Sequence, residues 1–119
     1  MLKRFMFLIA ISLFSLQVFA QETKAMSQFI VHFELGASWD KSLPPQQQPK
    51  FAEHSQNLNR LRKQNVIVFG ARYSDLGVII VEAESLAAAE AIISVDPGIQ
   101  SGIFNYKIAK LNVFYPWKK

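Results

Sequence analysis

The chain has 119 residues, of which 50% are hydrophobic and 18% charged, and it contains no cysteine. A chain of this length corresponds to one small domain. The absence of cysteine excludes disulfide bonds, a thiol nucleophile and a lipid-modified cysteine near the amino terminus. The formal net charge is +4, and it falls to +2 without Lys3 and Arg4, because 11 basic residues then remain against nine acidic ones. A net charge of +2 gives an electrostatic field that is too weak to favour a nucleic acid as partner.

The first twenty residues have the pattern of a cleaved signal peptide. A basic start is followed by an apolar run over residues 5–16, and small residues precede a cleavage point after Ala20. The stretch between the basic start and this point spans about 24 Å as a helix. That is shorter than the roughly 30 Å hydrocarbon core of a bilayer, so cleavage is favoured over a stable membrane anchor. We therefore expect a periplasmic or secreted protein, with residues 21–27 as an N-terminal extension.

An alternating segment and an amphipathic segment open the predicted mature chain. In residues 28–35, QFIVHFEL, large apolar side chains occupy every second position, which predicts a strand with one buried face. A loop rich in proline and glutamine follows. Proline is tolerated in the first turn of a helix, so we expect a helix from about Pro49 to Gln64. His54 then lies in its second turn, at a position of the apolar stripe.

The remaining chain is predicted to form a hairpin, a helix and a last strand. Residues 66–72 and 78–83 are apolar runs separated by the turn sequence YSDLG, which is typical of a hairpin. We expect Ser85 to cap a second helix, which Asp96-Pro97-Gly98 ends. Residues 103–114 alternate and predict the final strand. The residues expected on the buried face of the second helix are Leu86, Ala89, Ile92 and Ile93.

The predicted order of elements is strand, helix, strand, strand, helix, strand. It is typical of the ferredoxin-like split βαβ fold (βαββαβ), an α+β fold in which a four-stranded antiparallel sheet carries both helices on one face. The runs Val66–Phe69 and Val78–Val81 are apolar on both faces, but the helices can cover only one of them. We therefore expect a second copy to cover the other face, which gives a homodimer of the dimeric α+β barrel type.

This topology predicts where the candidate site residues meet. The two helices run antiparallel, so the start of the first lies beside the end of the second, and His54 should meet Asp96. The second strand, ending at Arg72 and Tyr73, and the loop with Trp39 should collect at the same edge. A histidine that is hydrogen-bonded to an aspartate has a fixed tautomer and a stabilised imidazolium, as general acid/base chemistry requires.

Four segments of the chain resemble those of a known family. They are FIVHF, FAEHSQNLNRLR, FGARYSDLG and VDPGIQSGIFNYKIAKLNVF, and together they are similar to the YCII-related proteins. The resemblance covers about residues 28–115 and leaves 116–119 as a C-terminal tail. It implies a small ferredoxin-like protein that forms dimers and an acid/base enzyme without a cofactor. The family's helix-1 histidine matches His54 and its Asp-Pro aspartate matches Asp96, which implies that these two residues are the catalytic pair.

The histidines and the aspartate also have other interpretations. His54 could be a core histidine bonded to a backbone carbonyl. Asp96 could cap a short helix, and one carboxylate oxygen could do so while the other accepts from the imidazole. His32 is the other histidine, on the strand face opposite the buried one, toward the dimer interface or the pocket. With His54 and Asp96 it could form a two-histidine, one-carboxylate metal site, but the strand and helix faces need not converge, so no metal is predicted.

The predicted substrate-binding residues surround the catalytic pair. Arg72 could bind an anionic group with its planar guanidinium, or it could pair with Asp75 or Glu34 at the surface. Aromatic side chains could line a pocket for a flat ligand or could belong to the core. Tyr106 and Trp117 are further aromatic candidates, although Trp117 could instead pack onto the dimer partner. The substrate-binding residues that we predict are Arg72, Tyr73, Trp39 and His32.

Two functions from different classes remain open. Phosphate loops, serine-nucleophile motifs and metal-ligand clusters are absent from the sequence, so nucleotide-dependent and acyl-transfer chemistry have no support. The first hypothesis is a cofactor-independent acid/base enzyme, in which His54 and Asp96 act on a small organic substrate by proton abstraction, elimination or isomerisation. The alternative is a non-catalytic module of the same fold that binds a small molecule or serves as an accessory protein.

Overall fold

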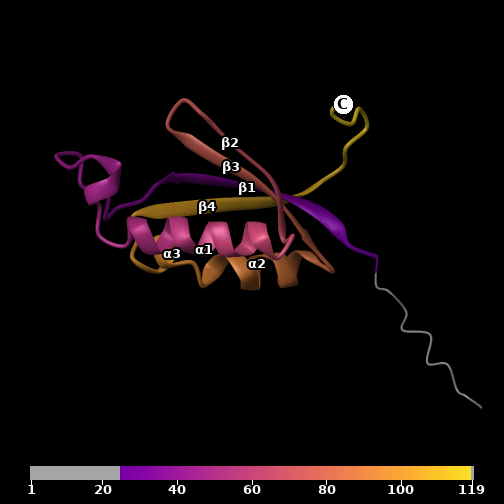
Figure 1. Cartoon of the computed structure of the whole chain (residues 1–119), viewed down its shortest axis with the longest axis horizontal. Helices are drawn as coiled ribbons and strands as arrows, with labels where there is room; N and C mark the ends of the chain where they lie inside the picture. Colours follow the sequence, from indigo (N-terminus) through magenta and orange to yellow (C-terminus); the bar gives the residue numbers. More distant parts are fainter. Residues whose placement is uncertain (1–24, 119) are drawn as a thin grey trace, which may run out of the picture.

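The computed structural model describes residues 25–118 and has a sheet whose three α-helices lie on one face (Figure 1). The predicted signal peptide lies outside the described residues. In the part of the chain that the structure describes, no helix is long and apolar enough to cross a bilayer. The elements are β1 (Ser27–Leu35), the 3-10 helix η1 (Pro45–Gln47), α1 (Phe51–Lys63), β2 (Ile67–Tyr73), β3 (Leu76–Ala83), α2 (Leu86–Ser94), α3 (Pro97–Gln100) and β4 (Phe104–Leu111).

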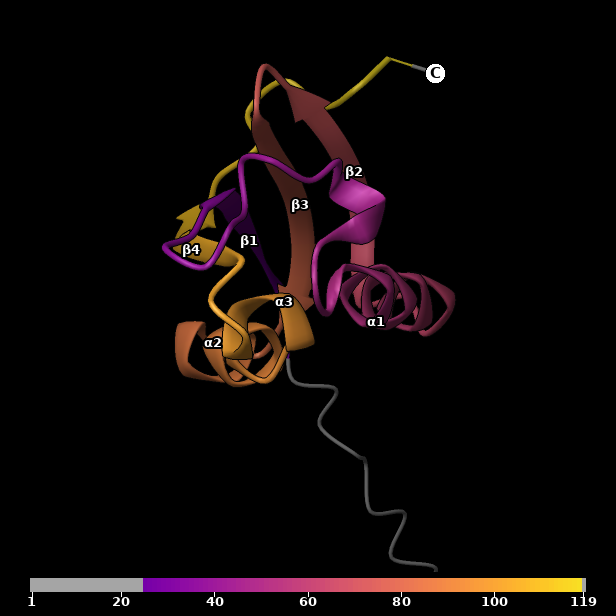
Figure 2. The same cartoon turned by 90° about the vertical axis from the view of Figure 1, so that its left-hand side faces the viewer.

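The four strands form one antiparallel sheet in the order β2-β3-β1-β4. The first strand therefore lies between the third and the fourth, and each half of the chain contributes one helix crossing to the same face of the sheet. Seen from the end in Figure 2, α1 and α2 lie side by side below the sheet, with α3 between them. This arrangement confirms the predicted ferredoxin-like α+β fold.

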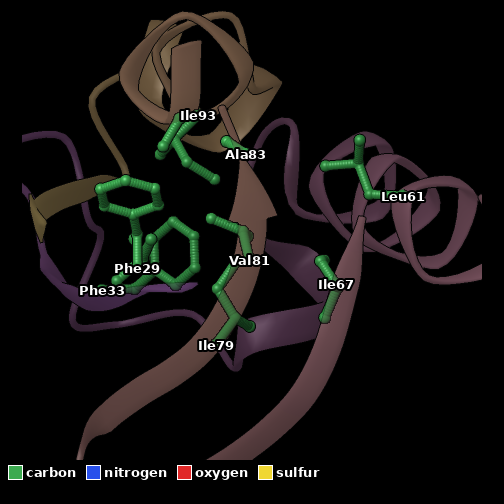
Figure 3. Packing of buried hydrophobic residues seen from close by; sticks show 10 residues of the cluster. Phe29, Phe33, Leu61, Ile67, Ile79, Val81, Ala83 and Ile93 are labelled. Carbon is green, nitrogen blue, oxygen red and sulfur yellow. The ribbon is translucent and has the colours of Figure 1, made fainter. Parts of the chain in front are cut away.

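The alternation of β1 places its large side chains in the core. Phe29, Val31 and Phe33 are at most 4% exposed, and they face the helices together with Ile79 and Val81 of β3. Figure 3 shows Phe29, Phe33, Ile79 and Val81 between the strands and the helices. Burial of each such side chain stabilises the fold by about 1.5–3 kcal/mol. The period-two pattern of residues 28–35 thus assigned the buried face, except that Leu35 at the end of the strand is 42% exposed.

The second helix agrees with the sequence at its cap and differs in its buried face. The Ser85 hydroxyl accepts a hydrogen bond from the Ala88 N–H at 3.1 Å, as expected for an N-cap. Ala89 and Ile93 are buried, whereas Leu86 is 45% exposed, so its predicted burial is wrong. Leu86 is the first helical residue, at the end of the helix, and Ile92 is partly buried against the core.

The chain between α2 and β4 contains a short helix, which is the second interpretation that the sequence offered for Asp96. Asp96 ends α2 as expected, but Pro97 then starts the four-residue helix α3, whose N-cap is Asp96. The last strand begins at Phe104 and ends at Leu111, three residues before the predicted end. Backbone pairing with β1 stops there, because its partner Gln28 is next to the start of that strand.

A close backbone contact fixes the loop that follows β1. The Gly36 N–H donates to the Ile103 carbonyl at 2.8 Å, and the Ser38 N–H donates to the Gly102 carbonyl at 3.0 Å. A Cβ atom on Gly36 would lie 2.1 Å from the Gly102 carbonyl oxygen, so no other residue fits without a backbone shift. Gly102 has φ of 78°, which glycine adopts without strain. This contact positions the start of the loop that carries Trp39.

The face of the sheet away from the helices is open and partly apolar. A β-bulge between Ile67 and Phe69 turns these two residues to opposite faces. Ile67 is therefore 4% exposed in the core, while Phe69 is 44% exposed on the open face. Tyr73 of the same strand is 51% exposed there. The face that we predict for the dimer interface is thus free in the single chain, and the homodimer itself stays a prediction.

Candidate active site

The histidine of α1 contacts the aspartate that follows α2. His54 Nδ1 lies 2.5 Å from the Asp96 Oδ2 atom. Both residues are buried, with 7% of His54 and 1% of Asp96 exposed. The 42 residues between them are bridged because the antiparallel helix pair places the start of α1 beside the end of α2. The contact that the topology predicts is therefore present, and a backbone carbonyl is not the partner of the imidazole.

Asp96 accepts hydrogen bonds from three donors. Its Oδ2 atom accepts from the Gly98 N–H at 2.9 Å as well as facing His54. Its Oδ1 atom accepts from the Asn57 Nδ2 atom at 2.8 Å. The carboxylate thus caps α3 and orients the imidazole at once, as the sequence suggested. It uses one oxygen for both tasks, because the amide of Asn57 occupies the other.

Asn57 belongs to a short hydrogen-bonded chain along α1. Its Oδ1 atom accepts from the Arg60 Nη2 atom at 2.7 Å, and Arg60 Nη1 donates to Gln64 Oε1 at 3.1 Å. A guanidinium can only donate and a carboxylate only accepts, so these neighbours fix which way the Asn57 amide points. His54, Asn57 and Arg60 are spaced three residues apart and therefore share one side of the helix.

Aromatic rings hold the imidazole of His54 in place. Its ring centroid lies 4.8 Å from that of Phe104 and 5.4 Å from that of Phe33, the latter edge-on at 84°. The ring centroid of Phe51, one turn earlier in α1, is 6.2 Å from that of His54.

The two ring nitrogens of His54 differ in their surroundings. No buried side-chain nitrogen or oxygen among the described residues lacks a hydrogen-bond partner. Nδ1 faces Asp96, and within residues 25–118 no side chain or backbone group bonds to Nε2. Because it has no partner there, Nε2 is not fully buried, and we assign it to the side of the ring that borders the adjoining cavity, which His54 lines.

The cavity beside the imidazole is mainly apolar. It has a volume of about 480 Å³ and lies between α1, the loop after β1 and the β2–β3 hairpin. This volume is within the range of about 300–1,000 Å³ that is common for small-molecule sites. Its aromatic lining residues are Phe33, Trp39, Phe51 and Phe104, and its polar ones are His54, Ser55, Arg72, Ser74 and Asp75.

Two of the four predicted substrate-binding residues line this cavity. They are Trp39 and Arg72. Within residues 25–118, Arg72 has no ion pair with Asp75 or with Glu34, and Glu34 instead pairs with Lys107 at 3.2 Å. The guanidinium at the cavity is therefore available to an anionic ligand.

The other two predicted residues lie on the open face of the sheet. His32 and Tyr73 contact each other edge-on, with ring centroids 6.3 Å apart, and neither lines the cavity. His32 points away from the helices because its neighbours in β1, Val31 and Phe33, fill the core. It is therefore separated from His54 by the sheet. Among the described residues, no group of three histidine, cysteine, aspartate or glutamate side chains could hold a metal ion.

A buried glutamine braces the loop that carries Trp39. Gln48 is 3% exposed, and its amide accepts from the Asp40 N–H at 3.0 Å and donates to the carbonyls of Asp40 and Leu43. Hydrogen bonds from the Ser42 hydroxyl, and then from its N–H, keep the pKa of the Asp40 carboxyl below its usual value. The bonds of Gln48 connect the two ends of the loop from which Trp39 and Pro45 line the cavity.

Several residues of this site were not predicted from the sequence. Asn57 could have been found, because it follows His54 by three residues and so lies on the same side of the helix. Phe51 was recognised only as part of the apolar stripe, and Phe33 only as a core residue of β1. No local sequence pattern marks Phe104 or Gln48 as part of the site, since their roles depend on how the loop after β1 meets the start of β4.

The fold and the site together define a class of protein. It is a ferredoxin-like α+β domain with a buried histidine–aspartate pair at the wall of an aromatic cavity. The sequence model of the YCII-related domain matches residues 32–112, which is most of the chain, so the protein belongs to the YCII-related family. No curated protein matches the chain.

Replacement of Asp96 by alanine tests the role of its carboxylate in stability. Asp96→Ala leaves His54, Asn57 and the Gly98 N–H without their acceptor inside the protein. We expect the free energy of unfolding to fall by about 3–5 kcal/mol, because each buried donor left without a partner costs about 1–3 kcal/mol. The control, Asp75→Ala on the exposed hairpin, should change it by less than about 0.5 kcal/mol. Equal effects of the two substitutions in urea unfolding would contradict this assignment.

Proposed function

We propose that this YCII-related protein is a cofactor-independent acid/base enzyme, in which His54 exchanges protons with a small organic substrate. One observation carries the proposal. The Nδ1 atom of His54 is held by the buried Asp96 carboxylate, while Nε2 is accessible from a cavity of about 480 Å³. A general base needs this division of roles, because one ring nitrogen must be oriented and the other must reach the substrate.

The geometry supports a two-step proton transfer. With Nδ1–H donating to Asp96, neutral His54 has its lone pair on Nε2, and Nε2 can take a proton from a carbon of the substrate. The electron pair of the broken C–H bond then delocalises into the substrate or expels a leaving group. The Asp96 carboxylate stabilises the imidazolium that forms. Return of the proton to another carbon gives isomerisation, and its loss to water after departure of a leaving group gives elimination.

The cavity favours a ligand with a flat apolar body. Phe33, Trp39, Phe51 and Phe104 supply ring faces and edges to its walls, and aromatic side chains pack well against planar groups. Arg72 adds a guanidinium without an ion partner among the described residues. A carboxylate or another planar anion on the ligand would accept two parallel hydrogen bonds from it. We therefore propose small conjugated or aromatic acids as the first ligands to test.

A non-catalytic binding module is the second candidate. The Asp96 carboxylate caps α3 and binds two side chains of α1, so it connects the two helices independently of any reaction. A pair with this structural role alone could sit beside a ligand pocket without turnover. The two candidates differ in what the loss of Nε2 does, because a structural pair does not use that atom.

Deuterium exchange distinguishes the two candidates and needs no identified substrate. The purified protein is incubated in D₂O with a panel of small carbon acids, such as ketones, lactones and conjugated acids, and loss of each C–H signal is followed by proton NMR. We expect His54→Asn to slow exchange of at least one compound by ~10²-fold or more, since general-base catalysis contributes that much. Asparagine can still donate to Asp96 through its amide, so the fold should remain.

The control for this experiment is His32→Asn, which changes the other histidine on the opposite face of the sheet. It should leave the exchange rate within about twofold of the unmodified protein. Exchange that persists in His54→Asn would show that Nε2 is not the base. Binding of a panel compound with no exchange of any member would favour the non-catalytic module.

We further propose that the protein is exported and forms a homodimer through the open sheet face. The pattern of residues 1–20 supports export. The dimer is supported by the apolar side chains on the face away from the helices, including Phe69 and Tyr73, which are 44% and 51% exposed. A sheet with one uncovered apolar face is commonly covered by a second copy.

Protein recovered from the periplasm of a bacterial host that expresses the full chain tests both statements. Mass spectrometry should give a subunit that begins at Gln21, and sedimentation should give twice the subunit mass at micromolar concentration. A subunit that keeps its first twenty residues would contradict cleavage. A single subunit mass at every concentration would contradict the dimer.

A further inference from the structure

An exposed apolar segment follows the last strand. We call residues 113–117 the aromatic tail. Val113 is 51% exposed, and Phe114, Tyr115 and Trp117 are 83%, 86% and 90% exposed. Within this segment the rings of Phe114 and Tyr115 contact each other, with their centroids 5.1 Å apart. The match to the YCII-related domain ends at residue 112, so the aromatic tail lies beyond the matched domain.

The aromatic tail lies on the same side of the sheet as the open face. In Figures 1 and 2 it rises from the end of β4 away from the three α-helices, so both views place it beyond the uncovered side of the sheet. A second copy that covers the open face would therefore meet the tail directly. The tail is thus continuous with the surface that we propose as the dimer interface.

The open face alone is small for a stable dimer. Four strands about 4.8 Å apart and about eight residues long give a face of roughly 500 Å². Two copies then bury about 1,000 Å² in total. Stable specific interfaces bury about 1,600 Å², and about 1,000 Å² is near the lower limit. The sheet contact therefore needs additional area.

The aromatic tail can supply the missing area. A phenylalanine, tyrosine or tryptophan side chain buries about 150–250 Å². Burial of Phe114, Tyr115 and Trp117 from each of two copies would therefore add up to roughly 1,000 Å², which brings the total to the standard size or above. The tail is also long enough to cross the sheet of a second copy. The six residues from Asn112 to Trp117 span up to about 20 Å when extended, which is about the width of the sheet.

We propose that the aromatic tail is a dimerisation arm, which packs against a second copy of this chain at the rim of the sheet interface. The contact is isologous, so each copy gives its tail to the other and receives one in return. Tryptophan and tyrosine are enriched among the few residues that contribute most of the binding energy of an interface. This inference rests on the proposed homodimer and adds the segment that stabilises it.

Tryptophan fluorescence reports directly on the tail. The chain has two tryptophans, so Trp39→Phe leaves Trp117 as the single reporter. We expect its emission to resemble that of tryptophan in water at low protein concentration and to shift to shorter wavelength as the dimer forms. A short-wavelength emission that is independent of concentration would show that the tail folds back on its own chain, and would overturn the proposal. Emission that stays water-like in the dimer would also overturn it.

Sedimentation equilibrium measures the contribution of the tail. In the triple variant Phe114→Ser/Tyr115→Ser/Trp117→Ser, the dimer dissociation constant should rise by ~10²-fold or more, because three interface aromatics are lost. The control Lys118→Ser should keep it within about threefold. The melting temperature of the monomer should not change in either variant, since these side chains are exposed in the single chain.

The possible results distinguish the proposed role of the tail from the proposed homodimer. A triple variant that dimerises as tightly as the control would show that the sheet face suffices, which overturns the arm and leaves the dimer intact. An unmodified chain that remains monomeric at every concentration would overturn the proposed homodimer together with the arm. A weakened dimer in the triple variant alone, with concentration-dependent Trp117 emission, is the result that we expect.

Discussion

The requirement that a buried carboxylate must be fully hydrogen-bonded organises this molecule. Asp96 is 1% exposed, and an unpaired charge at such a position would cost several kcal/mol. Its two oxygens accept hydrogen bonds from His54 and Asn57 of α1 and from the Gly98 N–H in the first turn of α3. One side chain therefore connects two helices that are far apart in the sequence, and the same bonds orient the imidazole.

The packing around this carboxylate leaves one side of the imidazole open. A Cβ atom on Gly98 would lie 2.8 Å from His54 Nδ1, so the side of the pair toward α3 is completely filled. Phe33 and Phe104 pack against the ring, and the cavity beside it remains as the access route to Nε2. Structural and chemical roles are thus combined in the pair: the bonds that stabilise the helix contact also set the tautomer that a base needs.

Topology made the His54–Asp96 contact predictable, because the order of elements and the antiparallel helices bring these two positions together whatever the details of side-chain packing. The alternation of residues 28–35 likewise fixed the buried face of β1. Other features depend on contacts between distant segments. The β-bulge that separates Ile67 from Phe69, and the approach of Gly36 to Gly102 that sets the loop with Trp39, have no local signature. The alternation of β1 did place His32 on the face opposite the buried one, but it could not show on which face the pocket lies, and the facing of Tyr73 depends on the bulge.

The tautomer of neutral His54 tests the central claim most directly. Nitrogen NMR of ¹⁵N-labelled protein distinguishes the two ring nitrogens, and the chain has two histidines, so His32→Asn assigns the signals. If Asp96 accepts from Nδ1–H, the neutral ring should carry its proton on Nδ1 and leave Nε2 unprotonated toward the cavity. A neutral ring protonated on Nε2 would mean that Asp96 does not accept from the imidazole, and it would contradict both the orienting role of Asp96 and His54 as the base.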